Sequence, residues 1–74
     1  MERVIFDYSR LKGRIYEVFG SQRKFADAMG MNRTSMWAKL TNRTYFNQAE
    51  IVRAASLLGI APGAGDAYFF TLKL

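Results

Sequence analysis

The sequence predicts a mainly α-helical fold: a bundle of four to five short helices in one domain that spans residues 1–74. Three observations lead to this prediction. Apolar residues recur at helical spacing in four successive segments. Residues that favour helix N-termini precede these segments, and glycines follow most of them. The chain ends are instead rich in residues that favour β-strands, and they can pair as a small antiparallel ribbon.

The first predicted helix begins at Tyr8, where Asp7 can cap it, and ends before Gly20. Its apolar residues fall on one stripe that should face the core. These residues are Tyr8, Leu11, Ile15, Val18 and Phe19.

The second predicted helix is capped by Ser21 and extends through Met29. Its expected inward residues are Phe25, Ala26 and Met29. Gly30 follows, where a left-handed residue is needed to end the helix.

The third predicted helix is capped by Asn32 and runs from Arg33 to about Leu40, with Met36 and Leu40 facing inward. A polar connection over residues 41–44 follows.

A fourth predicted helix starts at Asn47, which forms a capping-box pattern with Glu50 three residues later. Gly59 ends this helix. Its expected inner residues are Ile51, Ala54, Ala55 and Leu58.

The tail after the glycine-rich loop at residues 61–65 is different and has the two-residue period of a strand over 67–74. One set of alternate positions holds Tyr68, Phe70, Leu72 and Leu74, and the other holds Phe69, Thr71 and Lys73. Residues 3–6 at the other end are also rich in strand-favouring side chains. The two ends can therefore pair with each other. Because a two-stranded ribbon is marginal in water, it would have to pack on the helices or on a second subunit.

The composition excludes most catalytic chemistry. The chain has no Cys and no His, so it lacks thiol nucleophiles, imidazole acid–base groups and the usual zinc ligands. Its six carboxylates are scattered, and the 61–65 loop lacks the Lys-Ser/Thr that completes a phosphate-binding loop. We expect neither an enzyme nor a metal or cofactor site. The N-terminus has no apolar run of the kind found in secretory signals, so we expect a cytoplasmic protein that does not contact a membrane.

Positive charge is concentrated in the middle third of the chain. The net charge is +5, and residues 21–43 hold five cations against the single carboxylate of Asp27. The cations are Arg23, Lys24, Arg33, Lys39 and Arg43. Such a cluster is either a solvated face or the binding surface for a polyanion.

Two helices joined by a short turn with Gly30 form a helix-turn-helix unit over residues 21–40. The stretch that carries it reads SQRKFADAMGMNRTSMWAKLTNR, and it resembles the helix-turn-helix of the lambda repressor/Cro class. The chain is similar to small phage-encoded Cro-like regulators over almost its whole length, although Lys39 and Leu40 stand in the reverse order of that class. The resemblance implies a sequence-specific regulator of transcription, of phage or prophage origin. The implied contacts to base edges come from Asn32, Arg33, Thr34 and Trp37, and those to the backbone come from Gln22 and Asn42.

The residue types fit these roles independently. A recognition helix enters the major groove by its N-terminal end, so base-reading side chains must cluster on its first turns. Arg33 can donate two parallel bonds to guanine, and Thr34 suits a polar edge or a thymine methyl. Asn32 can pair with adenine, but as the cap of the third helix it already uses its side chain. Trp37 either touches DNA or covers the core. The expected phosphate contacts are Gln22, Arg23, Lys24, Ser35, Lys39, Asn42 and Arg43.

We expect the partner to be a double-stranded DNA operator bound by a homodimer, because one small subunit offers few base contacts. The alternative is a protein-interaction module, such as an antirepressor, that uses the same fold to bind another regulator.

Overall fold

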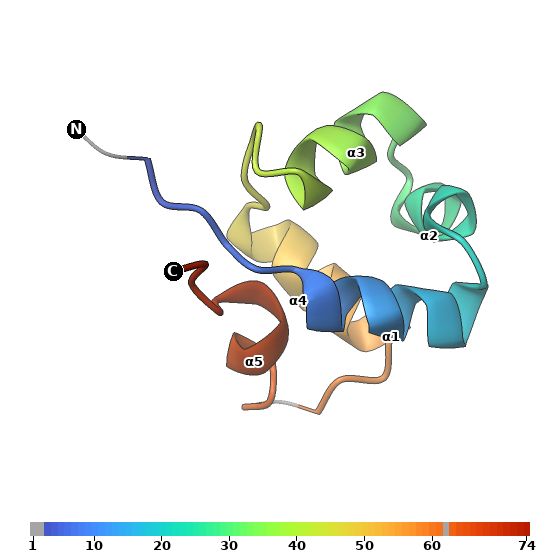
Figure 1. Ribbon diagram of the computed structural model, residues 1–74. Coiled ribbons are helices and arrows are strands. Elements are labelled where there is room, and N and C mark those ends of the chain that lie inside the picture. The colour runs from blue at the N-terminus through green and yellow to red at the C-terminus, as the bar shows by residue number, and fades with distance from the viewer. Residues whose placement is uncertain (1–2, 62) are drawn as a thin grey trace.

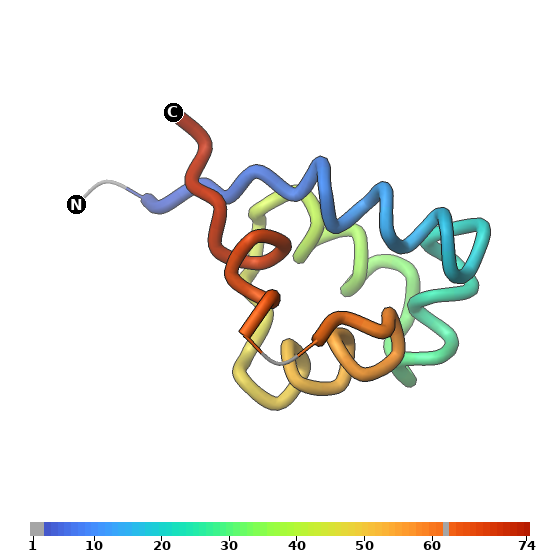
Figure 2. Tube along the Cα trace, turned by 90° about the horizontal axis from the view of Figure 1, so that it is seen from below, coloured from blue at the N-terminus to red at the C-terminus, as the bar shows by residue number. Residues whose placement is uncertain are grey.

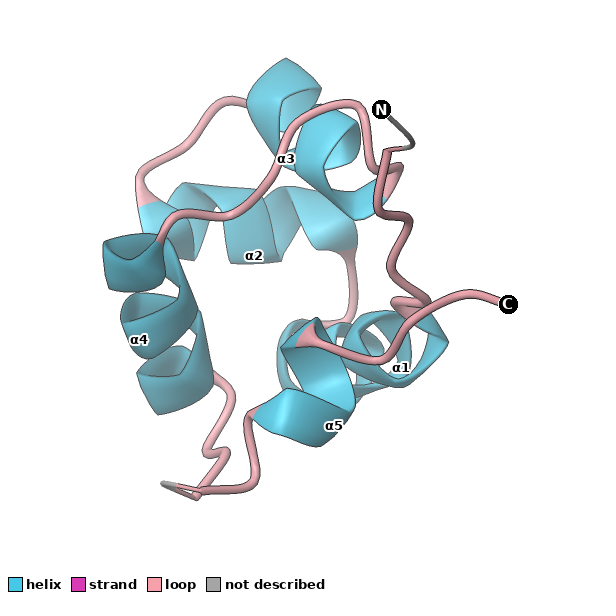
Figure 3. Cartoon of the chain, turned by 90° about the vertical axis from the view of Figure 1, so that its left-hand side faces the viewer, coloured by secondary structure: helices cyan, strands magenta, loops and turns pink. Residues whose placement is uncertain are grey.

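A computed structural model describes residues 3–61 and 63–74. The described residues form five helices, which confirms the prediction of a mainly α-helical bundle (Figure 1). The helices are α1 (Ser9–Phe19), α2 (Gln22–Met29), α3 (Arg33–Leu40), α4 (Gln48–Leu57) and α5 (Asp66–Phe69). Their inward side chains form one core, and Figure 3 shows the helices arranged around the middle of the molecule. No helix in the described ranges is both long and apolar enough to span a bilayer.

The core collects the inward faces that the periodicity predicted. Three of its aromatic rings meet edge to face: the centroids of Tyr8 and Phe46 are 5.8 Å apart, and those of Phe46 and Phe69 are 5.7 Å apart. The buried apolar residues are Tyr8, Leu11, Ile15, Phe25, Ala26, Met29, Met36, Leu40, Phe46, Ala54, Leu58 and Phe69. Val18 was expected among them, but this prediction is wrong because its side chain is 43% exposed. Phe19 packs at that edge instead, 5.5 Å from the ring of Phe25.

Local capping fixes the ends of α2, α3 and α4. The Ser21 hydroxyl accepts a bond from the Lys24 amide, and the Asn32 side chain accepts one of 2.7 Å from the Ser35 amide. Asn47 forms with Glu50 the full capping box that the sequence predicted. The first helix differs slightly, since it begins at Ser9 rather than Tyr8. Asp7 still accepts bonds from the amide and the hydroxyl of Ser9.

The first and last described segments, residues 3–6 and 70–74, lie on the same side of the molecule (Figures 1 and 2). They meet in the antiparallel sense at a single bridge between Phe6 and Leu72. Two backbone bonds flank it: the Asp7 amide donates to the Thr71 carbonyl at 2.8 Å, and the Lys73 amide donates to the Ile5 carbonyl at 2.9 Å.

The predicted strand over 67–74 is nevertheless wrong, because its first half is the helix α5. A helical turn places Phe69 in the core against Phe46, where it is 2% exposed. The core contact therefore outweighs the alternating pattern, and the described residues contain no strand.

Candidate nucleic-acid interface

A short turn over residues 30–32 joins α2 to α3, and the core fixes the geometry of this pair. Gly30 has φ 71°, which only a residue without a Cβ adopts without strain, and it reverses the chain after α2. Ala26 is fully buried, and its carbonyl accepts a 2.9 Å bond from the amide of Met31 in the turn. Met36 and Leu40 anchor α3 to the core. The opposite side of α3 and its first turn therefore face solvent.

The first turn of α3 presents the side chains that were expected to read bases. Arg33 and Thr34 are exposed there, and no described carboxylate lies within 4.0 Å of the Arg33 guanidinium. Asn32 is exposed too, but its side-chain oxygen holds the Ser35 amide. Asn32 therefore caps α3, as the sequence predicted.

Trp37 lies at the rim of α3, with 49% of its surface exposed. The Arg43 guanidinium carbon lies 4.8 Å from the centroid of its ring. Trp37 thus faces solvent and a cation rather than closing the core. With Gln22, Arg23, Arg33 and Met36 it lines a groove of about 200 Å³ between the starts of α2 and α3.

Arg23 and Arg33 are the exposed cations that line this groove, and the exposed Arg43 lies over the ring of Trp37. Lys24, the residue after Arg23 on α2, is exposed too. Gln22 and Ser35 are half-buried beside them. Together with the first turn of α3 they form the α2–α3 face, defined here as Gln22, Arg23, Lys24, Arg33, Thr34, Ser35, Trp37 and Arg43. Of the predicted site residues, Gln22, Arg23, Arg33 and Trp37 line the groove together, and Arg43 lies over the ring of Trp37.

Lys39 does not belong to this face, and the structure gives it a different role from the expected phosphate contact. Its ammonium lies 3.0 Å from Glu50 Oε1 and donates a 2.9 Å bond to the Tyr45 carbonyl. Its side chain is only 15% exposed. Lys39 therefore ties the end of α3 to the start of α4, and its charge is already neutralised by a carboxylate.

Asn42 also departs from its expected role as a phosphate contact. It is 9% exposed and adopts φ 65°. Its Oδ1 accepts a 2.8 Å bond from the Phe6 amide, and its Nδ2 donates a 2.9 Å bond to the Phe6 carbonyl. The side chain thus pairs with the backbone of Phe6 as a neighbouring strand would, which leaves it buried beneath the N-terminal segment.

Sequence reasoning missed Tyr45 as a partner in this arrangement. Its hydroxyl donates a 2.6 Å bond to the Val4 carbonyl, and Arg3 lies over its ring at 5.5 Å. No local pattern signals these contacts, because they join residues 41 or more positions apart.

The Glu50 carboxylate makes stability depend on pH in the acid range. Burial raises its pKa, but the Asn47 amide and the Lys39 ammonium outweigh burial, so the pKa lies below its ordinary value. A carboxylate with a lowered pKa stabilises the folded state above the unfolded pKa, about 4.3, and this contribution is lost as the pH falls through the folded value. We expect Glu50→Gln to flatten the fall in unfolding free energy below about pH 4, as measured by urea denaturation at successive pH values.

The matched control for this prediction is Glu17→Gln. Glu17 also pairs with a cation, Arg14, but its side chain is 69% exposed, so the pair should contribute little. Equal flattening by the two variants would contradict the role given to Glu50.

Comparison with known proteins places the chain in a family. A family model described as a protein of unknown function (DUF739) matches residues 4–72. The chain belongs to this family. The DUF739 chain is also similar to a solved structure, that of the modulator of repression (MOR) of the temperate bacteriophage TP901-1 from Lactococcus lactis. The two are 37% identical, the match covers 88% of each chain, and the TM-score is 0.79. No curated protein matches the DUF739 chain.

This likeness confirms part of what the sequence predicted. The chain has the fold of this phage modulator of repression. The predicted resemblance to small phage regulators is thus confirmed by one solved structure of such a protein.

Proposed function

We propose that the chain is a sequence-specific regulator that binds duplex DNA, with α3 (Arg33–Leu40) as its recognition helix in the major groove. The observation that carries the proposal is the exposed first turn of α3 with exposed cations on both sides. Arg33 and Thr34 would read base edges there. Arg23, Lys24 and Arg43 would bind phosphates, with Gln22 and Ser35 adding hydrogen bonds.

Two departures from the expected contacts refine this proposal. Lys39 and Asn42 leave the set, because their polar groups bond within the protein. Asn32 serves α3 as a cap, so base reading depends on Arg33 and Thr34, with Trp37 at the edge. One subunit of 8.5 kDa then offers few base contacts, and we propose that two copies bind half-sites about 34 Å apart.

The test is a gel-shift series, over increasing salt, with the DNA upstream of the gene. Arg23, Lys24 and Arg43 by themselves would contribute about −2.7 per subunit to the slope of log affinity against log salt. Sedimentation of the complex should show two subunits per duplex. Binding to neither this DNA nor any sequence selected from a random pool would overturn the proposal.

A second candidate function has its own supporting observations. The related modulator of repression is named for modulating repression, and Trp37 exposes half of a large aromatic surface beside the groove at Met36. Exposed aromatic side chains beside grooves are typical anchors of protein interfaces. In this alternative the chain is an antirepressor that binds a repressor protein through the α2–α3 face. Trp37→Ala would then abolish binding to the repressor, and no salt-dependent gel shift would be seen with the protein alone.

A further inference from the structure

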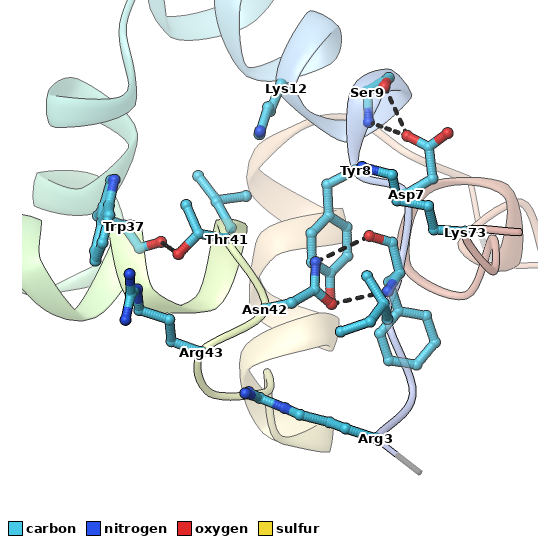
Figure 4. A pocket seen from close by; sticks show the side chains of 13 residues that line it. Arg3, Asp7, Tyr8, Ser9, Lys12, Trp37, Thr41, Asn42, Arg43 and Lys73 are labelled. Atoms are coloured by element: carbon cyan, nitrogen blue, oxygen red, sulfur yellow. Dashed lines mark hydrogen bonds between the residues drawn. The ribbon is translucent and has the colours of Figure 1, made fainter.

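A second basic surface lies beside the C-terminal end of α3. It is a hollow of about 600 Å³ between the N-terminal segment, the start of α1 and the loop after α3 (Figure 4). Cations from four separate parts of the chain line it: Arg3, Lys12, Arg43 and Lys73. Among the described residues, Asp7 is the one carboxylate in this lining.

The charge of this hollow is not balanced within the described structure. Among the described residues, ion pairs join Arg14 to Glu17 and Lys39 to Glu50. Neither pair includes a cation of the hollow. Asp7 accepts two bonds from Ser9, at 2.9 and 2.6 Å. Four like charges around one hollow repel one another, so the arrangement favours an anion that can lie among them.

Specific contacts hold the walls of the hollow in place. Asn42 and Tyr45 attach the N-terminal segment through three hydrogen bonds to the backbone of Val4 and Phe6. They position Arg3 on one wall, and Trp37 supports the Arg43 guanidinium on the other. Binding to such a preformed surface costs little ordering of the protein. The buried amide of Asn42 therefore helps to hold Arg3 at the hollow.

We propose that the hollow binds the sugar–phosphate backbone of the duplex next to the bases that α3 reads. This inference rests on the proposed function. Trp37 lines both the hollow and the groove at the start of α3, so the two adjoin at this side chain. The hollow is larger than one phosphate requires, and its cations come from opposite walls, which suits a strand with repeated charges. Arg3 and Arg43 add planar guanidinium groups that can bind phosphate oxygens in pairs.

The test compares two double variants that remove the same charge. Arg3→Ala with Lys12→Ala removes two cations of the hollow, whereas Arg10→Ala with Arg53→Ala removes two exposed cations that do not line it. Fluorescence anisotropy with a labelled duplex, over a salt series, measures the slope of log affinity against log salt. We expect the slope for the hollow variant to be shallower by about 1.8 per subunit. The control variant should keep the slope of the unchanged protein, and circular dichroism should show that both variants are folded.

The outcomes separate this inference from the function on which it rests. If the unchanged protein binds no duplex, the proposed function fails and takes this inference with it. If it binds, and the two double variants have equal slopes, only the site in the hollow is overturned. Polyglutamate is added as a competitor of the labelled duplex. If it displaces the duplex as strongly as unlabelled duplex does, and only from the protein with an intact hollow, the occupant of the hollow is an acidic protein and not the phosphate backbone.

Discussion

Replacing Asn42 with alanine is expected to lower the free energy of unfolding by about 2–4 kcal/mol. The Phe6 amide and carbonyl would lose their partners, at 2.8 and 2.9 Å in the intact protein. Alanine would also have to adopt φ 65°, a left-handed conformation that its Cβ disfavours. Because each kcal/mol shifts the melting temperature of a small domain by about 4–8 °C, thermal unfolding should show the loss clearly.

Two further substitutions at this position separate the causes. Asn42→Gly removes the side-chain bonds but tolerates the positive φ, so it should be less destabilising than alanine. Asn42→Asp keeps an acceptor for the Phe6 amide but places a carboxylate against the Phe6 carbonyl. Hydrogen exchange at the Phe6 amide should therefore be faster in the alanine and glycine variants than in the aspartate variant. Equal exchange in all three would contradict the pairing of Asn42 with Phe6.

Replacing Arg33 with alanine is expected to relax the sequence preference of DNA binding more than any other change on the α2–α3 face. A bidentate contact from arginine to guanine contributes about 1–3 kcal/mol of discrimination, or roughly 5- to 150-fold. Arg33 is exposed at the first turn of α3, and its removal should leave the core unchanged because Met36 and Leu40 hold the helix. The measurement is selection of bound sequences from a random duplex pool by the two proteins, followed by affinities for the best site and for single-base changes.

Lys24→Ala is the matched control for Arg33→Ala. It also removes one exposed cation, at the start of α2, but from a position expected to contact only phosphate. Affinity should fall by a similar factor for every sequence, and the salt slope should become shallower by about 0.9. If Lys24→Ala relaxed the sequence preference and Arg33→Ala did not, the assignment of base reading to the first turn of α3 would be wrong.

The sequence alone determined the features that depend on residues close together in the chain. Ser21, Asn32 and the Asn47–Glu50 pair cap their helices as predicted, because each contact spans only three residues. Helical periodicity placed most core residues correctly, since burial follows the spacing of apolar side chains along a helix. The same local reasoning placed Arg33 and Thr34 on the exposed first turn of α3.

Only the tertiary structure decided the roles that depend on residues far apart in the chain. Asn42 looked like a surface residue in a polar connection, but it is buried because Phe6, 36 positions away, supplies two backbone partners. Lys39 is bound by Glu50, and the tail forms α5 because Phe69 fills the core beside Phe46. The basic hollow also arises from segments that meet only on folding. Local sequence patterns do not predict such pairings, because the energy of a contact between distant residues depends on which two side chains the fold places next to each other.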